Sequence, residues 1–199
     1  MSAGTTTSSP VASTVLKSPA QNEAGRGSTA EVRGIVENVI ADIRERGDAA
    51  VREYSQKFDN YGPESFLLTE EQLAEVMGRV PQQVIDDITF VQDQVRTMAQ
   101  KQRESLSDFE IETLPGVRLG QKNVPVQAAG AYIPGGKYPL LASAHMTIVT
   151  AKVAGVERGA AGTPLIKGEM PDATIAAMHL AGADEIYLLG GIQAVAAMA

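Results

Sequence analysis

The spacing of apolar residues divides the chain into a helical first part and an alternating second part. From about residue 28 to residue 104, apolar side chains recur every three or four positions, which predicts amphipathic helices. Ser28 to Glu31 has the spacing of a capping box, and Thr69 with Gln72 repeats it. We expect buried stripes at Val32, Ile35, Val36, Val39, Ile40 and Ile43 in a helix ended by Gly47; at Val51, Tyr54 and Phe58 in a second helix capped by Asp48; and at Val84, Ile88, Val91, Val95 and Met98 in a long helix after Pro81.

The long helix has two interpretations. Its near-heptad stripe indicates either packing on its own domain or a dimerisation element. After it, Glu110–Leu114 and Val117–Leu119 flank Pro115-Gly116, which predicts a β-hairpin. The first 27 residues are rich in Ser, Thr, Ala, Gly and Pro and are expected to form a flexible arm. The expected divisions are therefore 1–27, a helical region with the hairpin over 28–123, and 124–199.

Residues 126 to 199 alternate between strand and helix signals. Strands are predicted at Gln127–Ile133, Arg158–Thr163 and Glu185–Leu189, with the first of them buried. Helices are predicted after each strand, and the first two of them end at Gly155 and Gly182. The fold class is therefore α/β, with a parallel sheet and right-handed crossovers.

Two glycine turns follow predicted strands. Pro134-Gly135-Gly136 follows the first strand, and Gly190-Gly191 follows the third. Ligands of parallel sheets bind at the carboxyl ends of the strands, so the two turns together indicate a binding site there. Neither turn matches the GxGxxG or GxxxxGK[ST] pattern, so each by itself is equally a tight connection between a strand and a helix.

The middle strand has an unusual composition. Arg158–Thr163 (RGAAGT) contains two glycines and has no β-branched residue before Thr163. We expect it to lie beside the first strand and to leave space unfilled. Valines at Gly159 and Ala160 are then expected to raise the melting temperature by several degrees.

Composition excludes several classes of protein. The formal net charge of −7 disfavours nucleic acid and anionic membranes as partners. With no cysteine and two histidines, the chain cannot build a thiolate or histidine-rich metal centre, so we predict no metal site. No apolar run of membrane-spanning length and no secretory signal occur in the sequence, so we expect a cytoplasmic protein.

Several long segments are similar to one known family. VQAAGAYIPGGKYPLLASAHMTIVTAKVAGV and ADEIYLLGGIQAVAAMA resemble the nucleotide-binding portion of the histidinol dehydrogenase family. RERGDAAVREYSQKFD and ETLPGVRLGQKNVPV resemble its N-terminal helical region and hairpin entry. The resemblance covers roughly residues 30 to 199, and KYPLLASAHM is closer to the sulfopropanediol dehydrogenase-like branch.

The resemblance implies an enzyme with a Rossmann-like NAD-binding unit. Members of the family are homodimeric, usually zinc-containing dehydrogenases that oxidise a primary alcohol, L-histidinol or a related hydroxyl compound, through an aldehyde to a carboxylate with NAD. Tyr132 and Gln193 match the family's NAD-contacting tyrosine and glutamine, and Gly135 and Gly136 belong to the same site. The family's zinc ligands and catalytic pair are not in this chain, so the sheet is expected to be incomplete. A catalytically inactive relative that serves as a binding or dimerisation module is the alternative.

Four further polar residues have a structural and a functional interpretation. His145 follows the first glycine turn and is either a partly buried structural histidine or part of a substrate pocket. His179 is expected to be structural or exposed. Lys137 is either solvated or in contact with an anion, and Ser143 either caps backbone groups or binds substrate.

Overall fold

The structure, a computed structural model, describes residues 24–135 and 138–199. The chain divides into two compact units, Met1–Ile35 and Val36–Ala199, with the boundary inside helix α1 (Ala24–Arg46). Because α1 begins at Ala24, Ser28 lies inside the helix, and the predicted capping box at Ser28 is wrong. In the first unit, Val32 and Ile35 are exposed, so the predicted stripe is buried only at Val39 and Ile43 of the second unit. The rest of this section concerns the second unit.

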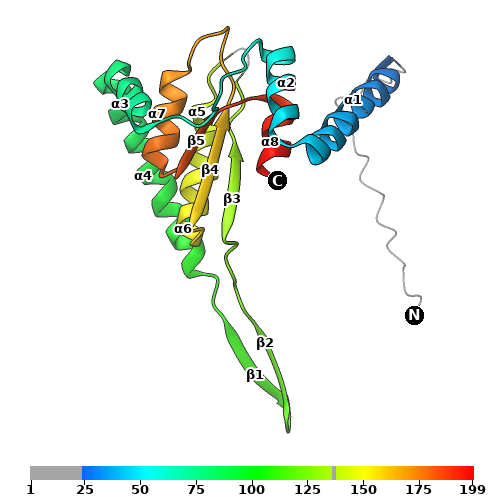
Figure 1. Ribbon diagram of the computed structural model, residues 1–199. Coiled ribbons are helices and arrows are strands. Elements are labelled where there is room, and N and C mark those ends of the chain that lie inside the picture. The colour runs from blue at the N-terminus through cyan, green and yellow to red at the C-terminus, as the bar shows by residue number, and fades with distance from the viewer. Residues whose placement is uncertain (1–23, 136–137) are drawn as a thin grey trace, which may run out of the picture. The chain divides into compact units, whose positions relative to one another are not determined.

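A three-stranded parallel sheet lies at the centre of this unit (Figure 1). Its order is β3 (Ala128–Tyr132), β4 (Arg158–Thr163) and β5 (Glu185–Leu188). Both pairings are parallel, which confirms the predicted alternation and makes the glycine-rich strand β4 the central one. The outer edge of β5 pairs with residues 66–68, since Leu188 N–H donates to Phe66 O at 2.8 Å.

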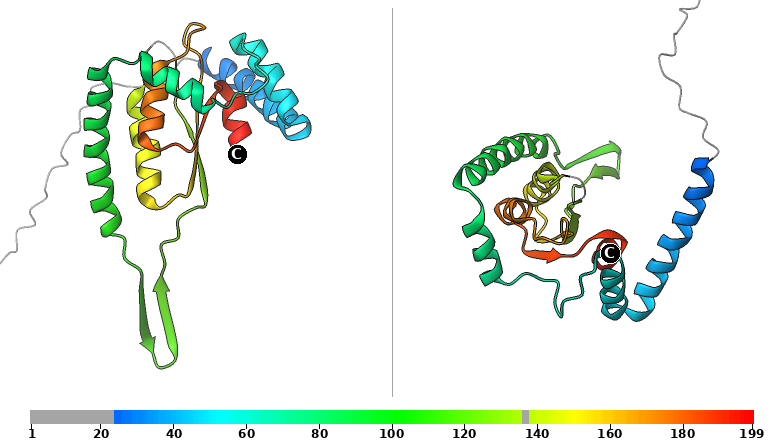
Figure 2. Two further views of the ribbon diagram at one scale, coloured as in Figure 1. Left: turned by 60° about the vertical axis from the view of Figure 1, so that its left-hand side comes forward. Right: turned by 90° about the horizontal axis from the view of Figure 1, so that it is seen from above.

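Helices cover both faces of the sheet (Figures 1 and 2). One face carries the helix after β3, which consists of α5, η1 and α6, and the helix after β4, which is α7. The long helix α4 packs outside them. The other face carries α8, which packs on β3 and against α2. The bounds of these helices are α2 Asp48–Asp59, α4 Gln82–Glu104, α5 Leu141–Ala144, η1 His145–Val149, α6 Thr150–Ala154, α7 Asp172–Ala181 and α8 Gly191–Met198.

The helix after β3 contains one wider turn of π-helix, η1, between α5 and α6. Two threonine hydroxyls donate to backbone carbonyls four residues earlier: Thr147 to Ser143, and Thr150 to Met146. Such bonds compete with the regular helical ladder, and π-turns are often found at functional positions. The sequence predicted the helix and its end at Gly155 (φ +96°), but not the π-turn.

Two of the helix ends predicted in the first half are confirmed, at Gly47 and at Thr69. Helix α3 (Glu70–Arg79) begins with the predicted capping box of Thr69 and Gln72, in which both reciprocal hydrogen bonds are present. Gly47 ends α1 with φ +58° and is itself the N-cap of α2, so Asp48 is the first helical residue and not the cap. Pro81 likewise lies one position before α4 as its N-cap.

The buried stripe of α4 differs from the predicted one. Ile88 is buried as expected, but Val91 and Met98 are 41% and 61% exposed. Val84 and Val95 pack against the core as predicted, and Gln92 and Ala99 are buried in place of the two exposed residues. Apolarity alone misplaced part of the stripe because a hydrogen-bonded glutamine replaces an aliphatic residue in the middle of this interface.

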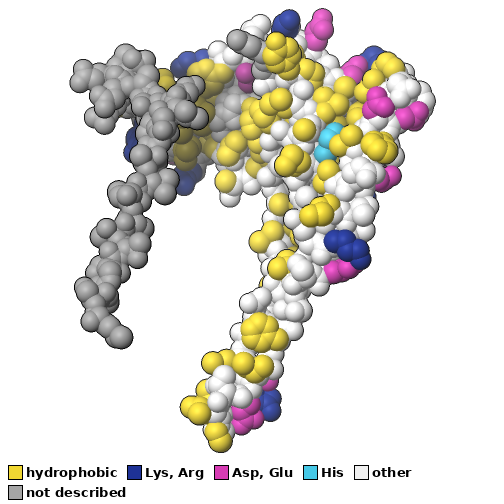
Figure 3. All heavy atoms as spheres, turned by 180° about the vertical axis from the view of Figure 1, so that it is seen from behind, with side chains coloured by type: hydrophobic (Ala, Val, Ile, Leu, Met, Phe, Trp, Pro, Cys, Tyr) yellow, Lys and Arg dark blue, Asp and Glu magenta, His cyan; other side chains and the backbone are white. Residues whose placement is uncertain are grey.

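The predicted hairpin is present and extends away from the sheet (Figures 1 and 3). It consists of β1 (Phe109–Leu114) and β2 (Val117–Gln121), and Gly116 at the turn has φ +81°. All its residues are exposed, and apolar side chains lie along it (Figure 3). They are Phe109, Ile111, Leu114, Val117 and Leu119.

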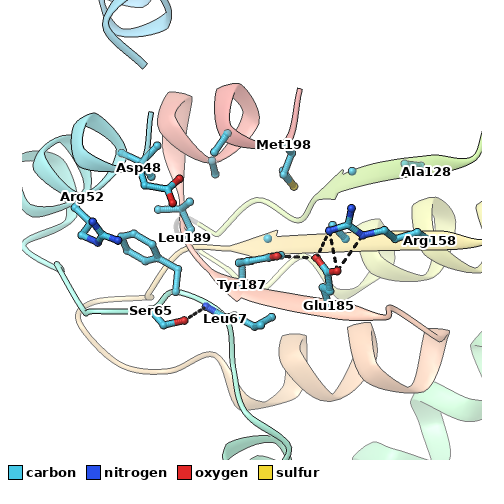
Figure 4. A pocket seen from close by; sticks show the side chains of 18 of the residues that line it. Asp48, Arg52, Ser65, Leu67, Ala128, Arg158, Glu185, Tyr187, Leu189 and Met198 are labelled. Atoms are coloured by element: carbon cyan, nitrogen blue, oxygen red, sulfur yellow. Dashed lines mark hydrogen bonds and ion pairs between the residues drawn. The ribbon is translucent and has the colours of Figure 1, made fainter. Parts of the chain in front are cut away.

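The strand predicted to be buried, β3, is an edge strand with exposed positions at Ala128 and Gly130. The prediction was wrong because an apolar run does not show whether a strand is central or at an edge. On the face that carries α8, small residues of β3 and β4 border a hollow of about 580 Å³ (Figure 4). Ala160 lines this hollow, which agrees with the unfilled space expected there.

We expect Ala160→Val to raise the melting temperature by about 2–4 °C. The β-branched side chain suits a strand, a gain of up to ~1 kcal/mol, and its methyl groups enter the hollow. Gly159→Val is expected to have no such gain, because a Cβ there already meets Asp184 Oδ2 and Lys152 Cε at 3.6 Å, beside their ion pair. Thermal melts of the two single variants check this, and an equal response of both would contradict it.

Candidate functional site

The carboxyl ends of the three strands meet around one proline. Pro164 follows β4, and the turns after β3 and β5 both pack on it. A Cβ built on Gly135 would lie 2.7 Å from Pro164 Cγ, and one built on Gly190 would lie 2.4 Å from Pro164 Cβ. Neither glycine can therefore carry a side chain without displacing Pro164. The two predicted glycine turns form one edge, as parallel strand ends require.

The predicted Tyr132 reaches the start of helix α8. The partly buried Tyr132 is the last residue of β3, and its hydroxyl accepts a hydrogen bond of 3.2 Å from Gly191 N–H. Gly191 has φ +68°, a conformation that favours glycine, and it is the first residue of α8. The structure thus brings Tyr132 to within one helical turn of Gln193. Gly136 and Lys137 lie outside the described residues.

The Gln193 side chain is completely buried in the first turn of α8. Its Nε2 donates to Asp59 Oδ2 at 2.9 Å, whereas its Oε1 has no hydrogen-bond partner. Asp59 is the last residue of α2, and burial raises the pKa of its carboxyl group, an effect that the bond from Gln193 partly offsets.

Sequence reasoning missed Asp59. A signal was available, because a carboxylate at the C-terminus of a helix is unfavourable in the field of the helix dipole. Such a residue needs another reason to be there, and here the reason is the amide of Gln193.

Unpaired buried polar atoms gather at the same edge of the sheet. Among the described residues, three buried side-chain oxygens lack a hydrogen-bond partner: Thr163 Oγ1, Thr174 Oγ1 and Gln193 Oε1. Thr163 ends β4, whereas Thr174 and Gln193 lie in the first turns of the helices after β4 and β5. Buried polar groups are nearly always paired in proteins, so such a concentration is expected where a ligand supplies the partners.

The 580 Å³ hollow is a separate feature, and neither Tyr132 nor Gln193 lines it (Figure 4). Glu185 lies at its wall, accepts a hydrogen bond of 2.6 Å from the Tyr187 hydroxyl and pairs with Arg158. The bond from Tyr187 and the Arg158 guanidinium lower the pKa of Glu185 and keep it ionised. These charges are already paired with one another, so we assign them a structural role.

The structure also decides between the interpretations of two other polar residues. His145 is buried, with its Nδ1 3.2 Å from Gln92 Nε2, and burial lowers its pKa. This is the structural interpretation of His145. His179 is exposed, as expected. The Ser143 carbonyl accepts the bond from Thr147 within the helix.

No group of three His, Asp or Glu side chains able to hold a metal ion occurs among residues 24–135 and 138–199. Within the same ranges, no helix is long and apolar enough to cross a membrane.

The structure is a parallel α/β unit whose glycine turns, Tyr132 and Gln193 lie at the carboxyl ends of its strands. The family model described as histidinol dehydrogenase matches residues 22–199. The chain therefore belongs to the histidinol dehydrogenase family, as its sequence motifs indicated.

Individual relatives have similar sequences, and one solved structure has a similar fold. The chain is 54% identical to a histidinol dehydrogenase homolog of Shouchella clausii, with 87% of this chain and 41% of that protein aligned. It is 42% identical to the sulfopropanediol 3-dehydrogenase of Ruegeria pomeroyi, with 87% and 40% aligned. The crystal structure of histidinol dehydrogenase from Elizabethkingia anophelis matches with a TM-score of 0.76 and 28% identity, covering 84% of this chain and 38% of that one. The chain thus spans about two fifths of the length of these relatives.

Proposed function

We propose that the carboxyl edge of the sheet is an NAD site and that the chain is the NAD-binding part of a dehydrogenase. The observation that carries the proposal is the meeting of Tyr132, Gly135 and Gln193 around Pro164 and the start of α8. Tyr132 offers a flat ring and a hydroxyl group, and the glycine turns have no side chains that would keep a ligand away from the backbone. Gly136 completes the site by resemblance.

The residues of this edge fit such a cofactor. Gln193 Oε1 and Thr163 Oγ1 are buried and unpaired, and the hydroxyl and amide groups of a dinucleotide could supply their partners. When bound, NAD supplies the acceptor for a hydride, while the chain's own residues bind and orient it. Zinc does not fit the described residues, which offer no group of three possible ligands for it.

The substrate proposed for the whole protein is a primary alcohol, L-histidinol or a related hydroxyl compound, oxidised through an aldehyde to a carboxylate. Relatives named for histidinol and for sulfopropanediol both support this class of substrate. Because this chain spans about two fifths of those relatives, the zinc ligands and the catalytic base are assigned to sequence that it does not contain. A homodimer is proposed on the same resemblance.

The alternative is a catalytically inactive relative that binds or dimerises. Sequencing the transcript beyond the codon for Ala199 distinguishes the two. A reading frame that continues into a region with zinc ligands supports the dehydrogenase. A stop codon directly after the codon for Ala199 supports the catalytically inactive relative.

We expect the 199-residue protein to bind NAD without turning over histidinol. Calorimetric titration measures the dissociation constant, and Gln193→Ala is expected to weaken binding about tenfold, the effect of one lost hydrogen bond in a closed site. Gln83→Ala, a change at an exposed glutamine of α4, serves as the matched control.

Three results would contradict parts of the proposal. Absence of NAD binding would remove the cofactor site from this chain. NADH formed from histidinol above the blank would show that the chain is active alone. Zinc retained in stoichiometric amount after dialysis would reveal metal ligands that the described residues do not provide.

A further inference from the structure

A single hydrogen bond fixes the orientation of the Gln193 amide. Gln193 Nε2 lies 2.9 Å from Asp59 Oδ2, and the amide is completely enclosed. An ionised carboxylate only accepts hydrogen bonds, so the atom facing Asp59 has to be the amide nitrogen. The amide oxygen is then necessarily directed away from Asp59. Oε1 is the atom left without a partner.

The turn before α8 closes over this oxygen. A Cβ built on Gly191 would lie 2.8 Å from Gln193 Oε1, so only a glycine leaves room for the amide there. Gly191 is itself exposed, and its N–H is held by the Tyr132 hydroxyl. The backbone of Gly191, which has no side chain, therefore lies next to Oε1. Oε1 is enclosed in this structure, so contact with a ligand group requires this turn to shift outward.

We infer that Asp59 is a positioning residue, which holds the Gln193 amide so that Oε1 acts as a hydrogen-bond acceptor for a donor group of the ligand. The inference rests on the proposed function, and it specifies the chemistry of the contact. The ligand group that meets Gln193 is a hydroxyl or an amide N–H, both of which a dinucleotide carries. A carbonyl or phosphate oxygen would be rejected, because it would face another acceptor.

The helix that carries Asp59 explains why the position is held so firmly. Asp59 ends α2, which packs against α8, and Asn60 follows in the left-handed conformation (φ 50°) as the C-cap. The backbone N–H of Asn60 donates to Ser55 O, and the Asn60 side chain accepts a hydrogen bond of 3.0 Å from Gln56. The carboxylate thus stands on a capped helix end and points at the first turn of a neighbouring helix.

Asp59→Asn tests the inference because asparagine has nearly the same shape as aspartate. Unlike the carboxylate, it does not require a hydrogen-bond donor from Gln193. Asparagine can accept from Gln193 Nε2 or donate to its Oε1, so the amide is no longer held in one orientation and can present a donor to the ligand instead. We expect the dissociation constant for NAD to increase at least about twofold, because only part of the molecules keep the competent orientation. The melting temperature is expected to stay within about 3 °C or to rise, because a half-buried charge is removed. The matched control is Asp87→Asn, which alters an exposed aspartate that accepts from Gln83 at 3.0 Å.

Nuclear magnetic resonance of the side-chain amides provides a readout that does not depend on NAD. Gln193→Ala identifies the Gln193 amide signals, and one of its protons should be displaced to low field by the carboxylate. Asp59→Asn is expected to abolish this displacement, and Asp87→Asn to leave it intact.

The outcomes separate this inference from the proposed function. If the unaltered protein binds NAD and Asp59→Asn binds it equally well, the positioning role is overturned. If the unaltered protein binds no NAD, the cofactor proposal fails, and the amide signals alone decide whether Asp59 fixes Gln193. Signals unchanged by Asp59→Asn would overturn the inference in either case.

Discussion

Replacing Gly190 by alanine is expected to destabilise the protein by about 3 kcal/mol and to abolish NAD binding. A Cβ at this position would lie 2.4 Å from Pro164 Cβ, 3.1 Å from its Cα and 3.3 Å from its Cγ. The backbone of Gly190 is extended (φ −116°), so the penalty arises from crowding and not from an unfavourable dihedral angle. Overpacking costs about 1–3 kcal/mol, and a rigid proline ring at the end of the central strand places this case at the upper end.

The measurement is a thermal melt together with an NAD titration. A loss of ~3 kcal/mol corresponds to a decrease of about 6–12 °C for a chain of this size. Gly78→Ala is the control, since nothing lies within 4 Å of its added Cβ and alanine favours helix α3 by up to ~1 kcal/mol. Its melting temperature should stay the same or rise. A normal melt and normal affinity in Gly190→Ala would show that the turns do not depend on Pro164.

Replacing Gln92 by leucine is expected to cost about 2–4 kcal/mol, although the change makes the core more apolar. Gln92 Nε2 approaches His145 Nδ1 at 3.2 Å and donates to Ala177 O at 2.9 Å, which joins α4, η1 and α7. Both side chains are buried, with 2% and 5% exposed for Gln92 and His145. Leucine would leave Nδ1 without a partner in the core, and an unpaired buried group costs ~1–3 kcal/mol in addition to the lost bonds.

The double variant Gln92→Leu/His145→Leu is expected to recover most of this loss. Replacing both partners by apolar side chains of similar size is nearly neutral, whereas replacing one is not. Gln83→Leu on the exposed side of the same helix controls for the loss of a glutamine. Melts of the unaltered protein, Gln92→Leu, His145→Leu and the double variant form the cycle. A double variant no more stable than Gln92→Leu would show that the pair contributes nothing beyond packing.

Acidification should act on the same pair. Gln92 Nε2 is a donor, so His145 Nδ1 accepts only while the ring is neutral. Burial lowers the pKa of His145, so below its ordinary value of about 6.5 the unfolded chain takes up the proton first. The contribution of His145 to the free energy of unfolding therefore has its full value above about pH 6.5. It decreases as the pH falls from there towards the lowered pKa. The double variant should lack this decrease.

Local signals in the sequence were sufficient to predict the type and order of most elements of the second unit. The alternation after residue 126 gave the parallel sheet, the Thr69 and Gln72 spacing gave a helix start, and Pro115-Gly116 gave the hairpin. These signals are local, because turn residues and apolar periods act within a few positions of the chain. The family followed in the same way from contiguous motifs, including the two glycine turns.

The buried positions and the contacts of the site residues follow only from the folded chain. The stripe of α4 passes through Gln92 instead of Val91, and β3 lies at an edge, because burial depends on the neighbours that long-range packing supplies. The contact of Gly190 with Pro164 and the bond from Gln193 to Asp59 join residues 26 and 134 positions apart in the chain. No local pattern encodes such contacts, since each arises when the strand ends and helices α2 and α8 are brought together in the folded sheet.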